Sequence, residues 1–243
     1  LASAHRLVVP SARLEAIARK AWAQPPGKVM RISNGIDVPR YSAPPAREIP
    51  GLDKRPGEIV IGTVAGLRPV KNLPRLVRAF AAMTSPESRL VVVGAGPESE
   101  RIAAEARALG VADRLVMPGF LADPWLWIGR FDIFALSSDS EQFPISLVEA
   151  MAAGLPAVAT AVGDVVHMVA DDNRPLIVDA GDEAAFAAAL DSLAERPDLR
   201  RAIGRANREK AAAEYDEAGM VERYARLYGE AIGRPGAFSP ASR

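Results

Sequence analysis

Residues 58–72 read EIVIGTVAGLRPVKN: an apolar run, a polar loop and the first residues of a helical pattern. An apolar run without alternation is typical of a parallel strand whose two faces are both covered by helices. The same succession recurs along the chain, with predicted strands over 58–65, 89–94, 114–117, 131–136, 156–160 and 175–178. Predicted helices lie between and after them, over 73–83, 98–109, 145–153, 165–170, 183–195, 199–214 and 218–232. The pattern predicts an α/β fold, a doubly wound Rossmann-like parallel sheet of about six strands with a helical C-terminus.

The segment before this domain is organised differently. Residues 6–9 and 28–32 are predicted strands, and Ser11 is the predicted N-cap of a helix over 12–22. Residues 34–57 open with the turn pair Asn-Gly and are rich in proline, so we predict a stiff linker with no secondary structure element. The chain does not begin with Met and its first residues already have the pattern of a strand, so we expect it to be a fragment.

Composition excludes several classes of protein. The 243 residues include 30 Lys and Arg against 30 Asp and Glu, so the chain lacks the basic surplus that nucleic-acid binding needs. No cysteine is present and His5 and His167 are the only histidines, so disulfides, thiol catalysis and a histidine metal cluster are not expected. The longest uncharged run, 150–163, is broken by Gly and Pro and is too short to span a bilayer. We expect a cytoplasmic protein without a secretory signal, cofactor or metal.

The loop after the first strand of the domain carries two cations, Arg68 and Lys71, just before a helix that Asn72 is predicted to cap. In a doubly wound sheet, ligands bind at the carboxyl ends of the strands, and free amides at a helix N-terminus favour anions. Arg68 can bind a diphosphate through two parallel hydrogen bonds, and Lys71 can bind it as a point charge. Taken alone, the loop fits two solvated surface cations equally well.

The turn 94–97, Gly-Ala-Gly-Pro, follows the second strand of the domain. It is similar to a dinucleotide-binding glycine motif, but Ser99 stands where the third glycine is required, and that motif belongs after the first strand. We interpret it as a glycine turn that reverses the chain into the next helix.

The segment 137–154 carries the strongest functional signal, because Glu141 and Glu149 are eight residues apart in an otherwise apolar stretch. The first lies in the loop before a predicted helix and the second about one turn inside it. Both can face a ligand whose phosphates rest on the amides of residues 143–146, which fits a nucleotide sugar, with hydroxyls at both ends and a diphosphate between. A buried carboxylate is costly unless it is hydrogen-bonded, so the alternative is that Glu149 pairs with an Arg or Lys as a structural bridge.

Other residues and motifs point to structure only. Trp125 and Trp127 flank a short apolar segment and are interpreted as packing residues, and His167 as a hydrogen-bonded structural histidine. The chain has no Gly-x-Ser-x-Gly elbow, no phosphate-loop motif and no His-Glu-x-x-His, so hydrolase, P-loop ATPase and zinc-protease functions lack their residues.

Several short motifs, taken together in their order and spacing, resemble one family. They are Asn34-Gly35-Ile36-Asp37, Gly62-Thr63-Val64 with Lys71-Asn72, Val93 to Pro97, Pro118-Gly119-Phe120, Glu141 to Glu149, and Glu149-Ala150-Met151-Ala152 with Gly154-Leu155-Pro156. Over nearly all its length the chain resembles the C-terminal, donor-binding half of the group 1 (family 4) retaining glycosyltransferases of the GT-B fold.

The resemblance implies a role for each matching position. Glu141 would touch the hydroxyls of the donor sugar, Lys71 would bind the diphosphate and assist its departure, and Glu149 would bind the ribose hydroxyls. The base would lie near Phe120. Sugar and diphosphate would be held by the amides of the stretch Gln142, Phe143, Pro144, Ile145 and Ser146. Such enzymes need no metal for the diphosphate, because cations and helix amides stabilise its charge.

Two departures from the family pattern carry expectations of their own. Gly66 stands where the family has an arginine, so either Arg68 or another cation replaces it, or phosphate affinity is lower. The acceptor-binding N-terminal domain is expected to be missing. Residues 1–33 would be its remnant, 34–57 an interdomain linker, 58–234 the donor-binding domain and 235–243 a disordered tail. We expect no transfer activity from the chain alone, and any membrane contact of the parent through the missing half.

Three other functions remain possible on the sequence. A GT-B-like nucleotide-sugar epimerase binds the same donor but matches the region of Glu141 and Glu149 poorly. A Rossmann-type nucleotide-binding module of a dehydrogenase needs a glycine motif at the first strand, where the chain has only Gly62 and Gly66. A non-enzymatic α/β interaction module would bind no nucleotide, and Glu149 would then have a protein partner.

Overall fold

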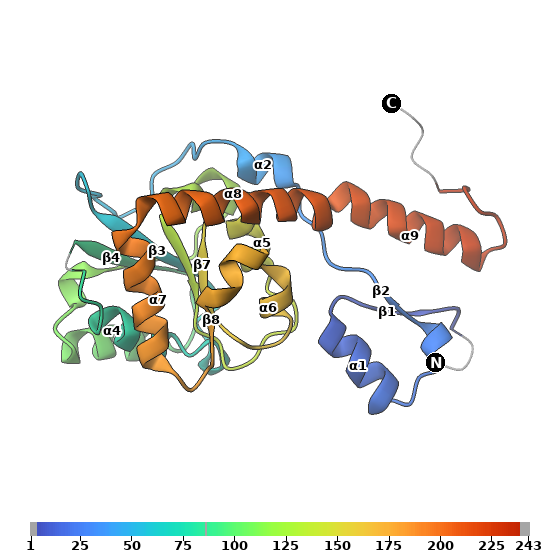
Figure 1. Cartoon of the computed structure of the whole chain (residues 1–243), viewed down its shortest axis with the longest axis horizontal. Coiled ribbons are helices and arrows are strands. Elements are labelled where there is room, and N and C mark those ends of the chain that lie inside the picture. Colours follow the sequence, from blue (N-terminus) through green and yellow to red (C-terminus); the bar gives the residue numbers. More distant parts are fainter. Residues whose placement is uncertain (1–3, 86, 239–243) are drawn as a thin grey trace.

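In the computed structural model, which describes residues 4–85 and 87–238, one parallel sheet has the strand order β5-β4-β3-β6-β7-β8 (Figure 1). Its strands are β3 (Ile59–Val64), β4 (Ser88–Val93), β5 (Leu115–Gly119), β6 (Ile133–Leu136), β7 (Ala157–Thr160) and β8 (Ile177–Val178). The α/β class and each of the six predicted strands are confirmed. From β3 the chain first adds β4 and β5 on one side and then β6, β7 and β8 on the other, so the order reverses between β3 and β6.

Helices cover both faces of the sheet, as the uninterrupted apolar strands predict. Along β4, Val91 and Val93 face one buried cluster and Leu90 and Val92 face the other. The first cluster includes residues of α2, α5 and the end of α8, and the second includes residues of α3, α4 and α7. The helices are α1 (Ala12–Lys20), α2 (Val38–Ser42), α3 (Leu73–Ala81), α4 (Ser99–Ala108), α5 (Ile145–Ala152), α6 (Val165–Met168), α7 (Glu183–Glu195), α8 (Pro197–Glu214) and α9 (Glu217–Ala231).

The predicted linker is not free of secondary structure, because it contains α2. Asp37 caps this helix by accepting a hydrogen bond from the backbone N–H of Arg40, and Pro39 lies in the first turn, where its missing N–H costs nothing. Val38 and Tyr41 are buried against the sheet domain. The apolar side chains between the prolines anchor this segment to the core.

The predicted capping role of Asn72 is also wrong. Asn72 precedes α3 in a left-handed conformation (φ 43°), and its side chain makes no cap hydrogen bond to that helix. Its amide nitrogen instead donates to the carboxylate of Asp139, at 3.1 and 3.2 Å. The side chain therefore joins two loops rather than closing a helix end.

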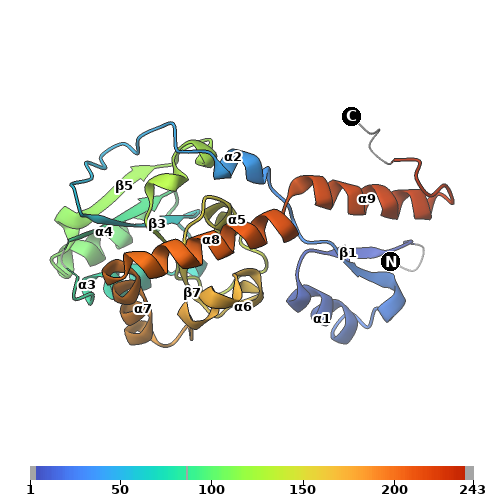
Figure 2. The same cartoon turned by 45° about the horizontal axis from the view of Figure 1, so that its top comes forward.

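A small unit lies beside the sheet domain and consists of β1 (Leu7–Val9), α1 and β2 (Val29–Arg31), with the two strands parallel. We call these elements the N-terminal unit. Val9, Ala18 and Val29 form its own small core. Figures 1 and 2 show it apart from the main sheet, on the side toward which α9 extends.

The chain segment that leaves the N-terminal unit and the junction of α8 and α9 meet at one place. Ile36 pairs with Asp216 in an isolated parallel bridge, donating its N–H to the carbonyl of Tyr215 and accepting from Glu217, both at 2.9 Å. A Cβ on Gly35 would lie 2.7 Å from the Cα of Glu217, so only glycine allows this approach. The junction of α8 and α9 is therefore tied to the chain that leaves the N-terminal unit.

The structure describes the end of the chain as far as residue 238. Residues 235–238 form a turn, and the ring of Phe238 lies edge-on to Tyr228 at 6.4 Å; residues 239–243 of the predicted disordered tail lie outside the described residues. In the described ranges, none of the helices combines the length and apolar character that crossing a bilayer requires.

Candidate functional site

The reversal of strand order places two loops side by side at the carboxyl edge of the sheet, where doubly wound folds bind their ligands. The loop after β3 and the loop after β6 are joined by hydrogen bonds. Asp139 donates its N–H to the carbonyl of Val70 at 2.8 Å, and the hydroxyl of Ser137 donates to the carbonyl of Lys71 at 3.0 Å. Arg75, on α3, donates to the carbonyl of Ser137 at 2.9 Å and pairs with Asp139 at 2.8 Å. The two loops form one surface.

The turn after β4 supports this surface from below. Leu67 donates its N–H to the carbonyl of Ala95 at 2.9 Å and accepts one from Glu98 at 3.1 Å. A Cβ on Gly94, whose φ is +146°, would lie 1.8 Å from the carbonyl oxygen of Ala65, and one on Gly96 would lie 2.4 Å from that of Leu67. The Gly-Ala-Gly-Pro turn therefore leads into α4, as predicted, and its glycines are needed for close backbone approach.

The two residues predicted to be catalytic are in direct contact. The ammonium of Lys71 lies 2.5 Å from Oε1 of Glu141, and the hydroxyl of Ser138 donates to the same oxygen at 2.6 Å. The side chain of Glu141 is 9% exposed and that of Lys71 25%. A carboxylate this buried needs a cation and a donor, and it has both.

A cavity of about 450 Å³ opens beside this pair. Its lining residues come from the two joined loops: Gly66, Arg68, Val70, Lys71, Ser140, Glu141, Gln142 and Phe143. Arg68 is exposed, and its guanidinium has no ion pair or hydrogen bond within residues 4–85 and 87–238. A Cβ on Gly66 would be 3.7 Å from Nε of Arg68, so this guanidinium lies against position 66. The cavity thus has an unpaired cation at its edge.

Helix α5 begins next to the cavity. Pro144 occupies the N-cap position, and no side chain of the described residues caps the helix, so the first amides of α5 are open to an anion. Ile145 is exposed and Ser146 half-buried. Of the predicted binding stretch, the structure brings Gln142 and Phe143 to the cavity wall, whereas Pro144, Ile145 and Ser146 lie beyond its lining.

Glu149 has a partner that the sequence reasoning missed. The hydroxyl of Tyr41, on α2, donates to its Oε1 at 2.6 Å, so the carboxylate is bonded to a neutral group rather than to an arginine or lysine. Burial raises the pKa of Glu149 above its usual value, and the Tyr41 hydrogen bond partly opposes this shift. Burial, followed by the contact with Glu149, raises the pKa of Tyr41 as well. The helix-start signal of Asp37 and Pro39 was the available indication of an ordered Tyr41.

Phe120 lies at the same edge of the sheet but away from the cavity. It follows β5, the outermost strand on its side, and its ring is 75% exposed. Trp125 and Trp127 are packing residues, as predicted: the first lies edge-on to Tyr41 at 6.3 Å, and the second is 2% exposed and donates to the carbonyl of Ala122 at 2.9 Å. Phe120 is therefore an exposed ring at the carboxyl edge of the sheet, outside the lining of the cavity.

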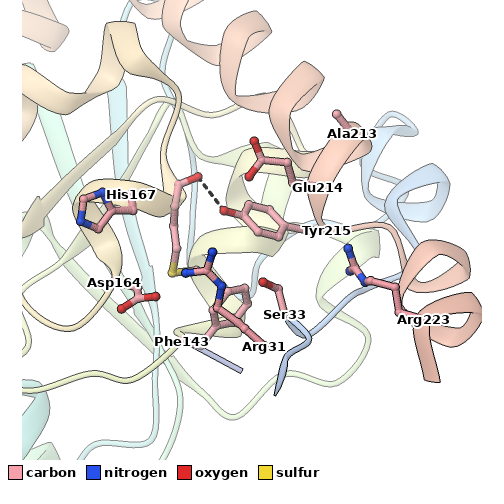
Figure 3. A pocket seen from close by; sticks show the side chains of 10 residues that line it. Arg31, Ser33, Phe143, Asp164, His167, Ala213, Glu214, Tyr215 and Arg223 are labelled. Atoms are coloured by element: carbon pink, nitrogen blue, oxygen red, sulfur yellow. Dashed lines mark hydrogen bonds between the residues drawn. The ribbon is translucent and has the colours of Figure 1, made fainter. Parts of the chain in front are cut away.

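A second pocket of about 350 Å³ shares the ring of Phe143 with the first (Figure 3). Figure 3 shows Tyr215 beside that ring, and the two rings meet edge-on at 5.5 Å. His167 lines this pocket with an exposed ring. The ring makes no hydrogen bond to any residue that the structure describes, so the predicted role of His167 as a hydrogen-bonded structural histidine is wrong. The other lining residues are Arg31, Ser33, Asp164, Met168, Ala213, Glu214 and Arg223.

Comparison with known proteins identifies the family. The model of the family described as "Glycosyl transferases group 1" matches residues 46–210. The chain is 34% identical over 198 residues to a D-inositol 3-phosphate glycosyltransferase of Segniliparus rotundus, covering 76% of this chain and 43% of that protein. It is 27% identical over 210 residues to an N-acetyl-alpha-D-glucosaminyl L-malate synthase of Bacillus anthracis, covering 84% and 54%. The chain thus spans about half the length of the curated relatives it matches.

Solved structures share the fold. HepE of Anabaena, crystallised with UDP, superposes with a TM-score of 0.83 at 23% identity, over 93% of this chain and 64% of that one. A sucrose-phosphate synthase of Thermosynechococcus elongatus gives a TM-score of 0.81 at 24% identity, over 93% and 58%. The predicted family and GT-B type of fold are confirmed. The chain belongs to the group 1 glycosyl transferases.

Proposed function

We propose that this chain is the donor-binding domain of a retaining glycosyltransferase, which binds a sugar nucleotide of UDP or GDP type in the cavity between the loops after β3 and β6. The observation that carries the proposal is the contact of Lys71 with Glu141, which lies beside the unpaired Arg68 and the uncapped start of α5. Cations and free amides converge there on a space that also holds a buried carboxylate. A diphosphate bonded to a polyhydroxyl group has the chemistry that this combination recognises.

Each part of the donor then has a partner. Arg68, Lys71 and the first amides of α5 meet the negative charge of the diphosphate, and Glu141 accepts hydrogen bonds from hydroxyls of the sugar. The free oxygen of Glu149 accepts from the ribose, because Tyr41 occupies the other. Phe120 provides an exposed ring for the base. The HepE structures with UDP and UDP-glucose support a donor of this kind on the same fold.

The reaction follows from this placement. The bond between the anomeric carbon and the diphosphate breaks, the diphosphate keeps the electron pair, and Lys71 stabilises the charge that develops on it. The acceptor hydroxyl forms its bond to the anomeric carbon from the same face and passes its proton to the departing phosphate oxygen. The configuration is thereby retained. Anomeric analysis of the product formed by the full-length protein tests this step, and an inverted product would contradict it.

The acceptor is proposed to bind in the remainder of the protein, to which the N-terminal unit belongs. Helix α9 supports this arrangement, because Val221 and Tyr228 on it and Ile232 just after it are each more than half exposed. Such side chains on a helix that extends beyond the sheet domain are suited to packing against a further domain. The chain alone is expected to bind donor without transferring sugar.

The test of donor binding is a calorimetric titration of the chain with UDP, GDP, ADP and NAD. We expect one nucleoside diphosphate to bind with a Kd on the order of 0.1–1 mM and Glu149→Ala to abolish the heat. Glu195→Ala, at an exposed position, is the control and should leave the titration unchanged. Binding of NAD alone would favour a dehydrogenase module. Absence of binding in both the native chain and Gly66→Arg would contradict the proposal.

A further inference from the structure

The loop after β7 holds a buried carboxylate that the proposed donor site does not use. Asp164 is 7% exposed, and its oxygens accept hydrogen bonds from the N–H groups of Ala12, at 2.5 Å, and Arg13, at 2.9 Å. Both donors belong to the first turn of α1, 152 and 151 positions away. Ser11 accepts from Leu14 at 3.1 Å, so the start of α1 is capped jointly by its own serine and by an aspartate of the sheet domain.

The side chain of Asp164 does not cap the helix that it precedes. Asp164 occupies the N-cap position of α6 but makes no side-chain cap hydrogen bond to that helix. Figure 3 shows it on the wall of the second pocket, yet its carboxylate forms no ion pair in the described part of the chain. Its negative charge is met by the amides and the positive dipole end of α1. The contact therefore serves the N-terminal unit, not the loop itself.

The same loop backs the donor site on its other side. Gly163 has a φ of +59°, and a Cβ there would lie 2.2 Å from the backbone oxygen of Glu141. Thr160, fully buried, donates its hydroxyl to the carbonyl of Ser138 at 2.6 Å. Ser138 in turn donates to Oε1 of Glu141. Residues 160–164 thus touch the loop that carries Glu141 at two points and α1 at a third.

We propose that Asp164 is a positioning residue for the donor site: by holding the start of α1 it fixes residues 160–164, which hold Glu141 in place for the donor sugar. Docking of the N-terminal unit and ordering of the donor loop are then one event. The inference rests on the proposed function for the role of Glu141, but the coupling between α1 and the loop is a property of the free chain and can be measured without donor.

Two variants break the contact from opposite sides. Asp164→Ala removes the acceptor. Ala12→Pro removes one donor and places the proline ring against the carboxylate, while proline at the first position of a helix is well tolerated. Ser11 already has φ −136° and ψ 153°, the extended conformation that a residue before proline adopts. Ala12→Pro is therefore compatible with the backbone of α1, and Ala12 itself makes no hydrogen bond to the loop that carries Glu141 in the described residues.

Hydrogen exchange of the chain without ligand reads out the coupling. Both variants should lower protection of the first turn of α1 and of the Asp139 amide, which bonds to Val70, by about fivefold, the loss typical of a carboxylate at a helix N-terminus. Protection in β4 should not change. Both should also weaken UDP binding about threefold, and Asp164→Asn should lie between Asp164→Ala and the native chain, because it keeps one acceptor.

Asp191→Ala is the matched control. Asp191 also accepts hydrogen bonds from two backbone amides, those of Thr84 and Ser85 at 3.0–3.1 Å, but touches neither donor loop. It should change exchange near 84–85 only. If Ala12→Pro loosens α1 and leaves the Asp139 amide as protected as before, the coupling is wrong. If the native chain binds no UDP while the exchange coupling is present, the proposed function fails and this inference stands.

Discussion

Glu141 and Glu149 lie eight residues apart, yet their surroundings differ in kind. Glu141 is in a loop, where a lysine and a serine hydroxyl meet the same oxygen. Glu149 is inside α5, where its partner is the neutral hydroxyl of Tyr41 and burial raises its pKa. A cation faces the first carboxylate, whereas burial opposes the charge of the second. The comparison shows two ways to hold a carboxylate ready for hydroxyl groups.

Removing the cation of the charged pair should give the largest effect on stability. Lys71→Met leaves Glu141 buried without its cation, so we expect the free energy of unfolding to fall by about 3 kcal/mol, as when one partner of a buried pair is removed. UDP affinity should fall at least about tenfold, the cost of roughly one charged hydrogen bond. Urea unfolding and calorimetry measure the two quantities.

The control for this variant is Lys54→Met. Lys54 pairs with Asp132 at 2.7 Å but is 40% exposed, so its loss should cost less than about 1 kcal/mol and leave UDP binding unchanged. The double variant Lys71→Met with Glu141→Gln should recover much of the stability but none of the binding. If Lys71→Met and Lys54→Met lost equal amounts of stability and UDP affinity, the buried pair of Lys71 with Glu141 would be no different from an exposed ion pair.

Tyr41→Phe tests the other carboxylate. It deletes the hydroxyl that Glu149 accepts and leaves the ring in place, so we expect the free energy of unfolding to fall by about 1–2 kcal/mol, the cost of a buried group left without its partner. UDP affinity should fall by a few-fold at most. Tyr228→Phe, at a tyrosine 54% exposed on α9, is the matched control and should change neither quantity.

The pH dependence of UDP binding should report the raised pKa of Glu149. The raised pKa of Glu149 means that its protonation stabilises the folded chain at low pH, and that this contribution is lost as pH rises through the raised pKa. For UDP the sign is opposite, because the ribose needs the charged acceptor. Affinity should therefore decline, about threefold, as pH falls from 7 through the raised pKa, above the ordinary value of 4.5.

Calorimetry of the native chain against Glu149→Gln isolates this decline. Titration of UDP itself affects both proteins equally, so only the difference between them reports Glu149. Parallel curves for the two proteins would show that Glu149 does not contribute through its charge.

The smallest effect is expected from Gly66→Arg. Arg68 already lies against this position, and two adjacent guanidinium groups compete for one diphosphate, so UDP affinity should rise no more than about threefold. In an Arg68→Ala background, Gly66→Arg should restore the UDP affinity that Arg68→Ala loses. A large gain in the native background would mean that Arg68 does not reach the phosphate.

The sequence was sufficient to predict the fold, for physical reasons, and it named side chains that the structure brings into contact. Apolar runs and helix caps are local patterns, so the six strands and most helices were predictable. Lys71 and Glu141 were each identified by their place at a strand end, and the sheet topology then brings them together. The hydroxyl of Tyr41 lies 108 positions from Glu149, and no local pattern links them.

The errors have the same origin. Asn72 has the right residue type for a cap, but Asp139 on the neighbouring loop competes for its side chain. Asp164 likewise precedes a helix and caps another one. A short polar side chain can hydrogen-bond to any of several groups that the fold brings near it. The residue type therefore predicts that a hydrogen bond forms but not which group is its partner.

The bridge of Ile36 with Asp216 has a mechanical consequence. The two covalent connections between the N-terminal unit and α9 on one side and the sheet domain on the other pass through a single point, held by two hydrogen bonds. Without the contact of Asp164 with α1, the two bodies would be joined at this point alone and could swing about it without stretching either connection. The missing side chain of Gly35 lets the two connections approach each other here, and a methyl group there would push them apart.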